Sequence, residues 1–142
     1  MPYSIATEQY YTAYNIVRKA GWPQISERSD RMLFNTGAAL LDAIVLAVVA
    51  REPEGTYGYK ITQEVRQVIE LSESTLYPVL RRLQKDECLE VYDRECSGRT
   101  RRYYKVTSRG WAQLHLYESE WRSYSGKITG LFEGRPVKRS EA

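Results

Sequence analysis

The sequence has few of the residues on which catalysis, metal binding and disulfide cross-linking depend. Its 142 residues include two cysteines and one histidine. Cys88 and Cys96 have neither disulfide-framework nor zinc-site spacing, so we expect reduced thiols and no metal. His115 precedes Glu118 by three positions, and a surface pair on a helix accounts for it without catalysis. Since a Gly-rich phosphate loop and a nucleophile elbow are also missing, we predict a protein that is not an enzyme and needs no cofactor.

Long hydrophobic runs are also missing. The most apolar segment, Gly37 to Ala50, has 14 residues and contains Asp42, whereas a membrane-spanning helix needs about 20 apolar residues. The N-terminus shows no basic segment followed by an apolar one, the pattern of a secretory signal. We therefore expect a cytoplasmic protein without a membrane partner.

The first half of the chain has the periodicity of helices. An aromatic helix is predicted over about Thr7–Lys19, followed by a polar linker at Gln24–Asp30, so that residues 1–30 form an N-terminal extension. The next segment, Leu33–Arg51, is apolar or small on nearly all sides, which predicts a helix buried from several directions.

Two short amphipathic helices joined by a tight turn come next. The first is expected to begin near Thr56 as its N-cap and the second at Ser72. Their apolar residues follow helical spacing: Ile61, Val65 and Val68 in the first, and Leu76, Leu80 and Leu83 in the second. This pattern is typical of a helix-turn-helix motif. Pro78 lies inside the second helix, where we expect it to remove a hydrogen bond and bend the axis.

The period then changes to that of a β hairpin. Leu89–Tyr92 and Tyr103–Val106 alternate, and the polar segment Arg94–Arg101 between them predicts a long tip. From residue 94 to residue 109 the chain has six basic residues and one acidic residue, a local charge of +5 in a protein of net charge +3. Such a concentration suits the phosphates of DNA; a solvated basic loop without a partner is the alternative.

The last helix is predicted from its cap at Thr107 to about Phe132. Its apolar residues repeat at spacings of three and four, the seam of a coiled coil, and are assigned to dimerisation: Leu114, Tyr117, Trp121, Tyr124, Ile128 and Leu131. The fold class is therefore mainly α with a small β hairpin: a winged helix-turn-helix domain over residues 31–107, a dimerisation helix over 108–133 and a tail over 134–142.

The exposed face of the second helix of the motif, together with the hairpin, forms the candidate surface for double-stranded DNA. Hydroxyl and guanidinium groups on one face suit phosphates and base edges in the major groove. We place Ser74, Thr75 and Tyr77 nearest the bases. The full candidate set is Ser72, Ser74, Thr75, Tyr77, Pro78, Arg81, Arg82, Lys85, Arg99, Arg101 and Arg102.

Over about residues 33–133 the chain resembles the PadR family of bacterial transcriptional regulators. The matching motifs are Tyr57-Gly58-Tyr59, the run Ser74-Thr75-Leu76-Tyr77-Pro78-Val79-Leu80-Arg81-Arg82-Leu83, Gly98, Arg102-Tyr103-Tyr104, and Thr107 with Gly110. The resemblance implies a winged helix whose C-terminal helix builds a homodimer, and a recognition helix that carries proline at the place of Pro78. Two features depart from the family: Cys88 stands where glycine is usual, and residues 1–30 extend the N-terminus.

Within this family the chain is similar to the subgroup of a lactococcal multidrug-responsive repressor, which binds flat aromatic compounds between paired tryptophans. The resemblance implies an effector site at Trp121 and Tyr117, although an anchor of the dimer core explains Trp121 equally. We therefore predict a repressor that binds a pseudo-palindromic operator as a homodimer and is released by a planar aromatic effector. The alternatives are a metal or thiol-redox sensor and a winged-helix protein-interaction module that does not bind DNA.

Overall fold

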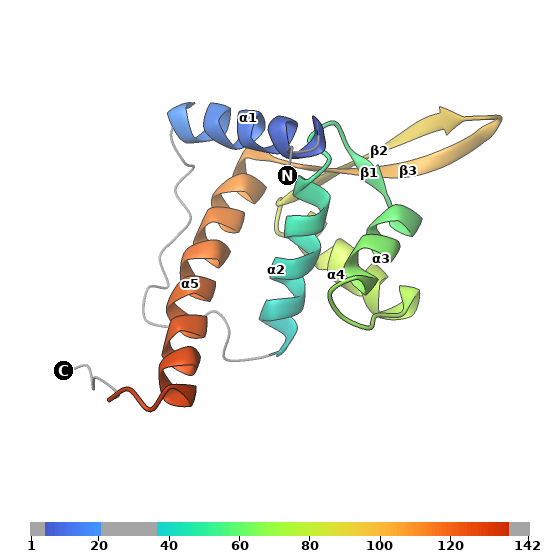
Figure 1. The fold of residues 1–142 in the computed structure, drawn as a ribbon. Coiled ribbons are helices and arrows are strands. Elements are labelled where there is room, and N and C mark those ends of the chain that lie inside the picture. Colours follow the sequence, from blue (N-terminus) through green and yellow to red (C-terminus); the bar gives the residue numbers. More distant parts are fainter. Residues whose placement is uncertain (1–4, 21–36, 137–142) are drawn as a thin grey trace.

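The computed structural model describes residues 5–20 and 37–136, and in it the helices pack around one core while a long β hairpin projects from the body (Figure 1). Helix α1 lies across the beginning of α5 and contacts it. The elements, in chain order, are α1 (Ile5–Ala20), α2 (Gly37–Ala50), β1 (Thr56–Tyr57), α3 (Gly58–Arg66), α4 (Glu73–Lys85), β2 (Leu89–Cys96), β3 (Arg99–Val106) and α5 (Ser108–Phe132).

The predicted class, mainly helical with a small β hairpin, is confirmed. The aromatic helix extends a residue or two beyond the predicted Thr7–Lys19 at each end. The linker Gln24–Asp30 and the expected helix start at Leu33 lie outside the described residues, as does most of the tail. In the part of the chain that the structure describes, no helix is both long and apolar enough to cross a membrane.

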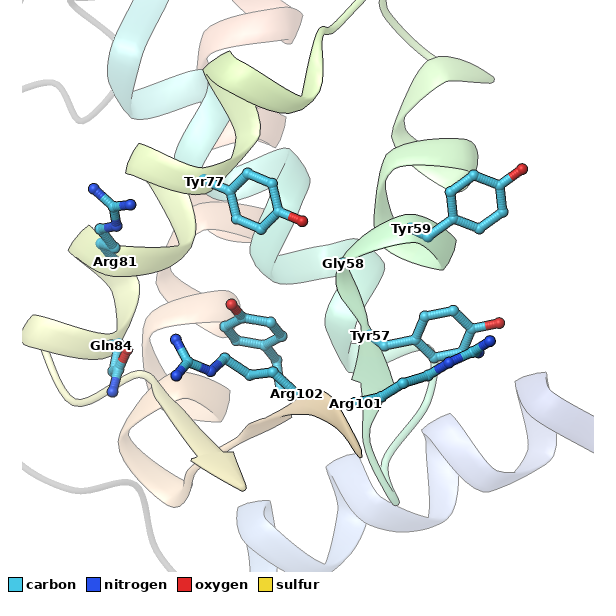
Figure 2. A pocket seen from close by; sticks show the side chains of 9 residues that line it. Tyr57, Gly58, Tyr59, Tyr77, Arg81, Gln84, Arg101 and Arg102 are labelled. Carbon is cyan, nitrogen blue, oxygen red and sulfur yellow. The ribbon is translucent and has the colours of Figure 1, made fainter. Parts of the chain in front are cut away.

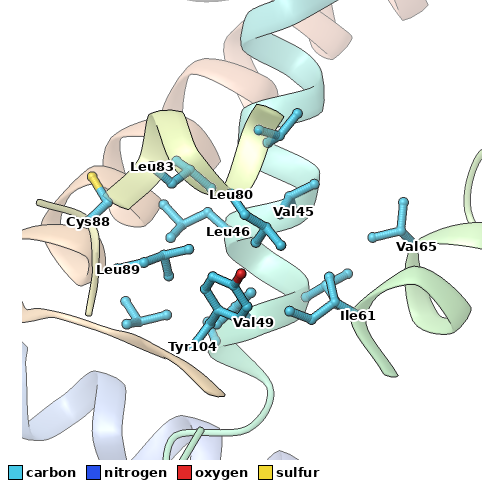
Figure 3. Close-up of a cluster of buried hydrophobic side chains, with 14 of the residues drawn as sticks. Val45, Leu46, Val49, Ile61, Val65, Leu80, Leu83, Cys88, Leu89 and Tyr104 are labelled. Atoms are coloured by element: carbon cyan, nitrogen blue, oxygen red, sulfur yellow. The ribbon is translucent and has the colours of Figure 1, made fainter. Parts of the chain in front are cut away.

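The core forms around α2, as its apolar composition predicts. Val45, Leu46 and Val49 are completely buried, because α3, α4, α5 and β3 all contact this helix. The leucine stripe of α4 packs against it, and Ile61 and Val65 of α3 complete the cluster (Figure 3). Val68 does not belong to this core: it lies beyond the end of α3 and is 67% exposed, so its place in the helix with Ile61 and Val65 is wrong.

The prediction that Thr56 caps a helix is wrong. Thr56 and Tyr57 form a short strand that pairs antiparallel with Tyr104 and Tyr103 of β3, giving a three-stranded sheet in the order β1-β3-β2. Thr56 is buried, and α3 begins at Gly58 without a side-chain cap. The backbone hydrogen-bonding groups of these two residues pair with β3, a contact that the local sequence does not indicate.

The prediction of a long hairpin tip is also wrong. Arg94–Cys96 and Arg99–Arg101 continue the two strands, and only Ser97 and Gly98 form the turn. Both have positive φ, 52° and 78°, the geometry that matches the twist of paired strands. The sequence does not predict the outer parts of the two strands, because both of their faces contact solvent and their residues therefore show no apolar alternation. We call residues 89–106 the wing.

Helix α4 ends in a Schellman motif, in which the two residues after the C-cap return their N–H groups to the last turn. The N–H of Glu87 donates to the carbonyl of Gln84 at 3.0 Å, and that of Cys88 donates to the carbonyl of Leu83 at 2.9 Å. The motif needs a left-handed residue, and here Glu87 supplies it with φ 61°. The positive-φ position thus belongs to Glu87 and not to Cys88, the residue at which the family usually has glycine.

Replacing Glu87 by glycine is expected to raise the free energy of unfolding by about 0.5 to 1 kcal/mol, because glycine adopts positive φ without a steric penalty. The ion pair lost with Arg109 is 3.7 Å long and exposed, so it contributes little. Urea denaturation measures the change. The matched control is Asp86→Gly, since Asp86 has φ −78°: it should destabilise, and a gain of similar size in both variants would contradict this account.

The predicted cap of α5 is confirmed. The Thr107 hydroxyl accepts from the N–H of Gly110 at 2.9 Å and donates to the carbonyl of Glu87 at 2.6 Å. It thereby joins the beginning of α5 to the end of α4 and the start of the wing. The helix runs to Phe132, where it was expected to end.

Candidate nucleic-acid interface

Helix α4 presents its polar face to solvent because its apolar stripe is fixed in the core. Ser72 caps the helix, its hydroxyl accepting from the N–H of Thr75 at 3.3 Å, and it lies 2.9 Å from the hydroxyl of Ser74. The opposite face, predicted from a helical wheel, is exposed at Ser74, Thr75, Tyr77, Pro78, Arg81 and Lys85. The helix is continuous across Pro78.

A basic hollow lies between α4 and the wing. We call it the α4–wing concavity; it has a volume of about 670 Å³ and brings together Tyr77 and Arg81 of α4 with Arg101 and Arg102 of β3. Figure 2 shows these side chains around the opening. Its full lining is Tyr57, Gly58, Tyr59, Tyr77, Arg81, Gln84, Arg101, Arg102 and Tyr104. Residues far apart in the sequence thus line one basic hollow, in which Arg101 and Arg102, as neighbours on β3, extend to opposite sides.

Other predicted residues lie around this hollow rather than in it. Ser72 and Thr75 line a second, smaller hollow with Arg66, at the opposite end of α4. Arg99 follows the turn at the far end of the wing, where its strand begins. The candidate residues are therefore spread along α4 and the wing and do not all lie in one hollow.

Arg82 is placed differently from Arg81. Its Nε donates to Oδ2 of Asp42 at 3.1 Å, and its Nη2 pairs with Oδ1 of the same carboxylate. The Asp42 side chain is only 14% exposed. Because α2 holds its guanidinium, Arg82 fixes the position of α4 against the core while Arg81 faces the concavity.

The candidate set predicted from the sequence lacks five of the lining residues. Tyr57, Gly58, Tyr59 and Tyr104 belong only to the family motifs, and Gln84 belongs to none of them. Gly58 separates the two tyrosines and lies close to Tyr77, since a Cβ on Gly58 would lie 3.2 Å from the Tyr77 hydroxyl. The sequence does carry a signal, because the Tyr-Gly-Tyr motif spans the end of β1 and the start of α3, but the pairing of β1 with β3 is needed to place it.

A third hollow, the α5 groove, is apolar. It has a volume of about 540 Å³ and lies between α2, the residues that follow α3, and α5. Trp121 lines it and is 46% exposed. Its lining is Leu40, Ala43, Ile44, Ala47, Val68, Ile69, Leu114, Tyr117, Glu118 and Trp121. Leu114 also packs in the core of its own chain, and burial raises the pKa of Tyr117 to about 12, which keeps its hydroxyl protonated.

Both cysteines are free thiols. Burial raises the pKa of Cys88 to about 11, so that the reactive thiolate is scarce at neutral pH. Cys96 is half-buried on the wing. Within residues 5–20 and 37–136, no group of three or more His, Cys, Asp and Glu side chains is placed to hold a metal ion.

The fold and the basic surface define a winged-helix protein of the DNA-binding class: a helix-turn-helix formed by α3 and α4 is followed by a basic wing. The sequence comparisons agree. The profile described as the transcriptional regulator PadR-like family matches residues 45–116. The chain therefore belongs to the PadR-like family of transcriptional regulators, which are DNA-binding proteins.

Individual relatives show the same similarity. An uncharacterized protein of Lysinibacillus sphaericus is 36% identical over 99 residues, which are 66% of this chain and 89% of that protein. A Streptococcus mutans structure is 37% identical with a TM-score of 0.66, covering 72% of this chain and 94% of the other. A PadR-like regulator of Bacillus cereus is 28% identical with a TM-score of 0.61, covering 68% and 94%.

Proposed function

We propose that the protein is a cytoplasmic repressor that binds a pseudo-palindromic operator as a homodimer. In this proposal α4 is the recognition helix in the major groove, where Ser74, Thr75 and Tyr77 read base edges. Arg81, Arg101 and Arg102 neutralise phosphates. The observation that supports this most directly is the meeting of these arginines with Tyr77 around the α4–wing concavity.

The homodimer is inferred from α5. Trp121, Leu131 and Phe132 are 46%, 61% and 89% exposed, and the α5 groove continues this apolar surface onto α2. Large apolar side chains exposed along one helix indicate a surface that a partner covers. A second copy pairs equivalent surfaces about a two-fold axis and presents two recognition helices to successive turns of the duplex.

Salt titration tests DNA binding. Three arginines in each copy let a dimer neutralise about six phosphates, so the logarithm of affinity should fall with the logarithm of salt concentration at a slope of roughly −5. Fluorescence anisotropy with a duplex from the region upstream of the gene, and with a mixed-sequence duplex, measures this slope. Absence of binding to both duplexes at low salt would contradict DNA binding and leave the interaction module as the better description.

The proposed effector is a planar aromatic compound in the α5 groove. An indole ring exposed beside apolar walls binds flat rings by stacking and burial. Ligand binding there changes DNA affinity only if it favours one arrangement of the two recognition helices over another.

Trp121 fluorescence should therefore be quenched by a planar aromatic dye, and the Trp121→Ala variant should lose this quenching. The chain has three tryptophans, so emission remains in the variant to serve as a reference. Trp111→Phe is the control, because Trp111 is 5% exposed in the core and its replacement should leave the quenching intact. Equal quenching of the wild type and Trp121→Ala would exclude stacking on Trp121.

A further inference from the structure

Three tyrosines form a row across the sheet, one from each strand. Tyr57 of β1 and Tyr92 of β2 are the partners of Tyr103 of β3, and each ring centroid lies 5.6 Å from that of Tyr103. The Tyr92 hydroxyl donates to the carbonyl of Glu54 at 2.6 Å, and the Tyr103 hydroxyl lies 3.4 Å from the sulfur of Cys96. The row is therefore tied to the turn before β1 and to the wing.

Two arginines lie over this row. Arg94 and Arg101 pair with each other, two residues from Tyr92 and Tyr103 along their strands. They lie on the same face as the tyrosines because side chains alternate along a strand. The guanidinium carbon of Arg101 lies 4.7 Å from the ring centroid of Tyr57, and that of Arg94 lies 5.6 Å from the ring centroid of Tyr103. Both distances are within the range of cation–π interactions. Figure 2 shows Arg101 extended along Tyr57.

The pairing of Arg94 with Arg101 is unfavourable in the isolated chain. Like charges directly opposite on a sheet repel each other. Other cross-strand pairs of the wing are complementary, Glu90 with Lys105 and Asp93 with Arg102. A pair of opposed arginines, each stacked on an aromatic ring, becomes favourable when a polyanion lies against it.

We infer that Tyr57 and Tyr103 are positioning residues for DNA binding, holding Arg101 and Arg94 in the orientation in which they meet phosphates. This inference rests on the function proposed above. A free arginine side chain has many rotamers, and ordering it opposes binding. Stacking on a fixed ring restricts these rotamers before DNA arrives, so Tyr57 contributes to affinity through Arg101.

A double-mutant cycle separates this role from a direct contact between Tyr57 and DNA. The variants are Tyr57→Leu, Arg101→Ala and the two combined, measured by anisotropy with a mixed-sequence duplex. Each single variant should lose about three- to tenfold in affinity, and the double variant should lose little more than Arg101→Ala alone. Tyr57→Phe keeps the ring and should keep nearly wild-type affinity.

Arg101→Lys tests the stacking without changing the sheet. Lysine keeps the charge but lacks the planar guanidinium group, so this variant should lose most of what Arg101→Ala loses. Urea denaturation of every variant checks that the fold is intact. If Tyr57→Leu does not fold, Arg101→Lys and Tyr57→Phe still decide the matter.

Losses that add in the double variant, wild-type affinity of Tyr57→Leu, or wild-type affinity of Arg101→Lys would each overturn the inference. If Arg101→Ala binds normally while removal of Arg81 and Arg102 weakens binding, the inference is wrong and the proposed DNA surface remains. If no arginine variant changes affinity, the proposed function fails too.

Discussion

Replacing Gly110 by alanine is expected to lower the free energy of unfolding by about 3 kcal/mol, enough to unfold much of a marginally stable protein. A Cβ at this position would lie 2.1 Å from the carbonyl oxygen of Cys88 and 2.7 Å from a methyl group of Val106. That carbonyl cannot move freely, since it accepts the N–H of Thr107 at 3.0 Å. The variant can fold only if α5 shifts away from the wing.

Gly126 provides the matched control because it lies in the same helix with nothing within 4 Å of an added Cβ. Gly126→Ala should raise the free energy of unfolding by about 0.5 to 1 kcal/mol, because alanine has a higher helix propensity than glycine. In Gly110→Ala the steric clash outweighs the same gain. Urea denaturation at one fixed protein concentration measures both, since the proposed dimerisation would make stability depend on concentration. Equal and small effects in the two variants would show that the contact with Cys88 relaxes easily.

Removing Arg81 and Arg102 together should weaken DNA binding about a hundredfold at low salt and make the salt slope less steep by about 2 per copy. Both guanidinium groups line the α4–wing concavity. The loss should be similar for operator and mixed-sequence duplexes, because phosphate contacts are independent of sequence. Anisotropy titrations over a series of salt concentrations measure affinity and slope together.

The control removes the same charge elsewhere: Arg122 and Lys127 are exposed on α5 and do not line the concavity. Their replacement by alanine should change affinity by less than about threefold. Tyr77→Ala gives the contrasting result, a larger loss for the operator than for mixed-sequence DNA, because Tyr77 is assigned to base edges. A uniform loss in the control double variant would mean that net charge alone determines binding.

The sequence predicted the helical part of this fold well because its signals are local. The leucine stripe of α4, the cap at Ser72 and the cap at Thr107 each depend on residues within a few positions, and the structure confirms all three. Strand β1 could not be predicted in this way. It exists because Thr56 and Tyr57 pair with residues almost 50 positions away, and two residues show no period of their own.

The candidate site shows the same division. The local charge count identifies the wing arginines, and the helical periodicity of α4 identifies Arg81 as exposed. Both the charge and the helical face depend only on residues close in the sequence. The wheel could not separate Arg81 from Arg82, since the partner of Arg82 is Asp42 on a distant helix. Tyr57 could not be assigned to the site from the sequence, because only its pairing with Tyr103 in the sheet brings it beside Arg101.

The shortness of β1 has a further consequence. Beyond Tyr103, β3 has no neighbour on its β1 side among the described residues, so Arg99–Arg102 leave backbone groups there open to another strand. Exposed strand edges template aggregation, and charged side chains are a common defence against it. We therefore expect the arginines of the wing to oppose edge-to-edge association as well. Variants that neutralise several of them at once should be checked for such association before their DNA affinity is interpreted.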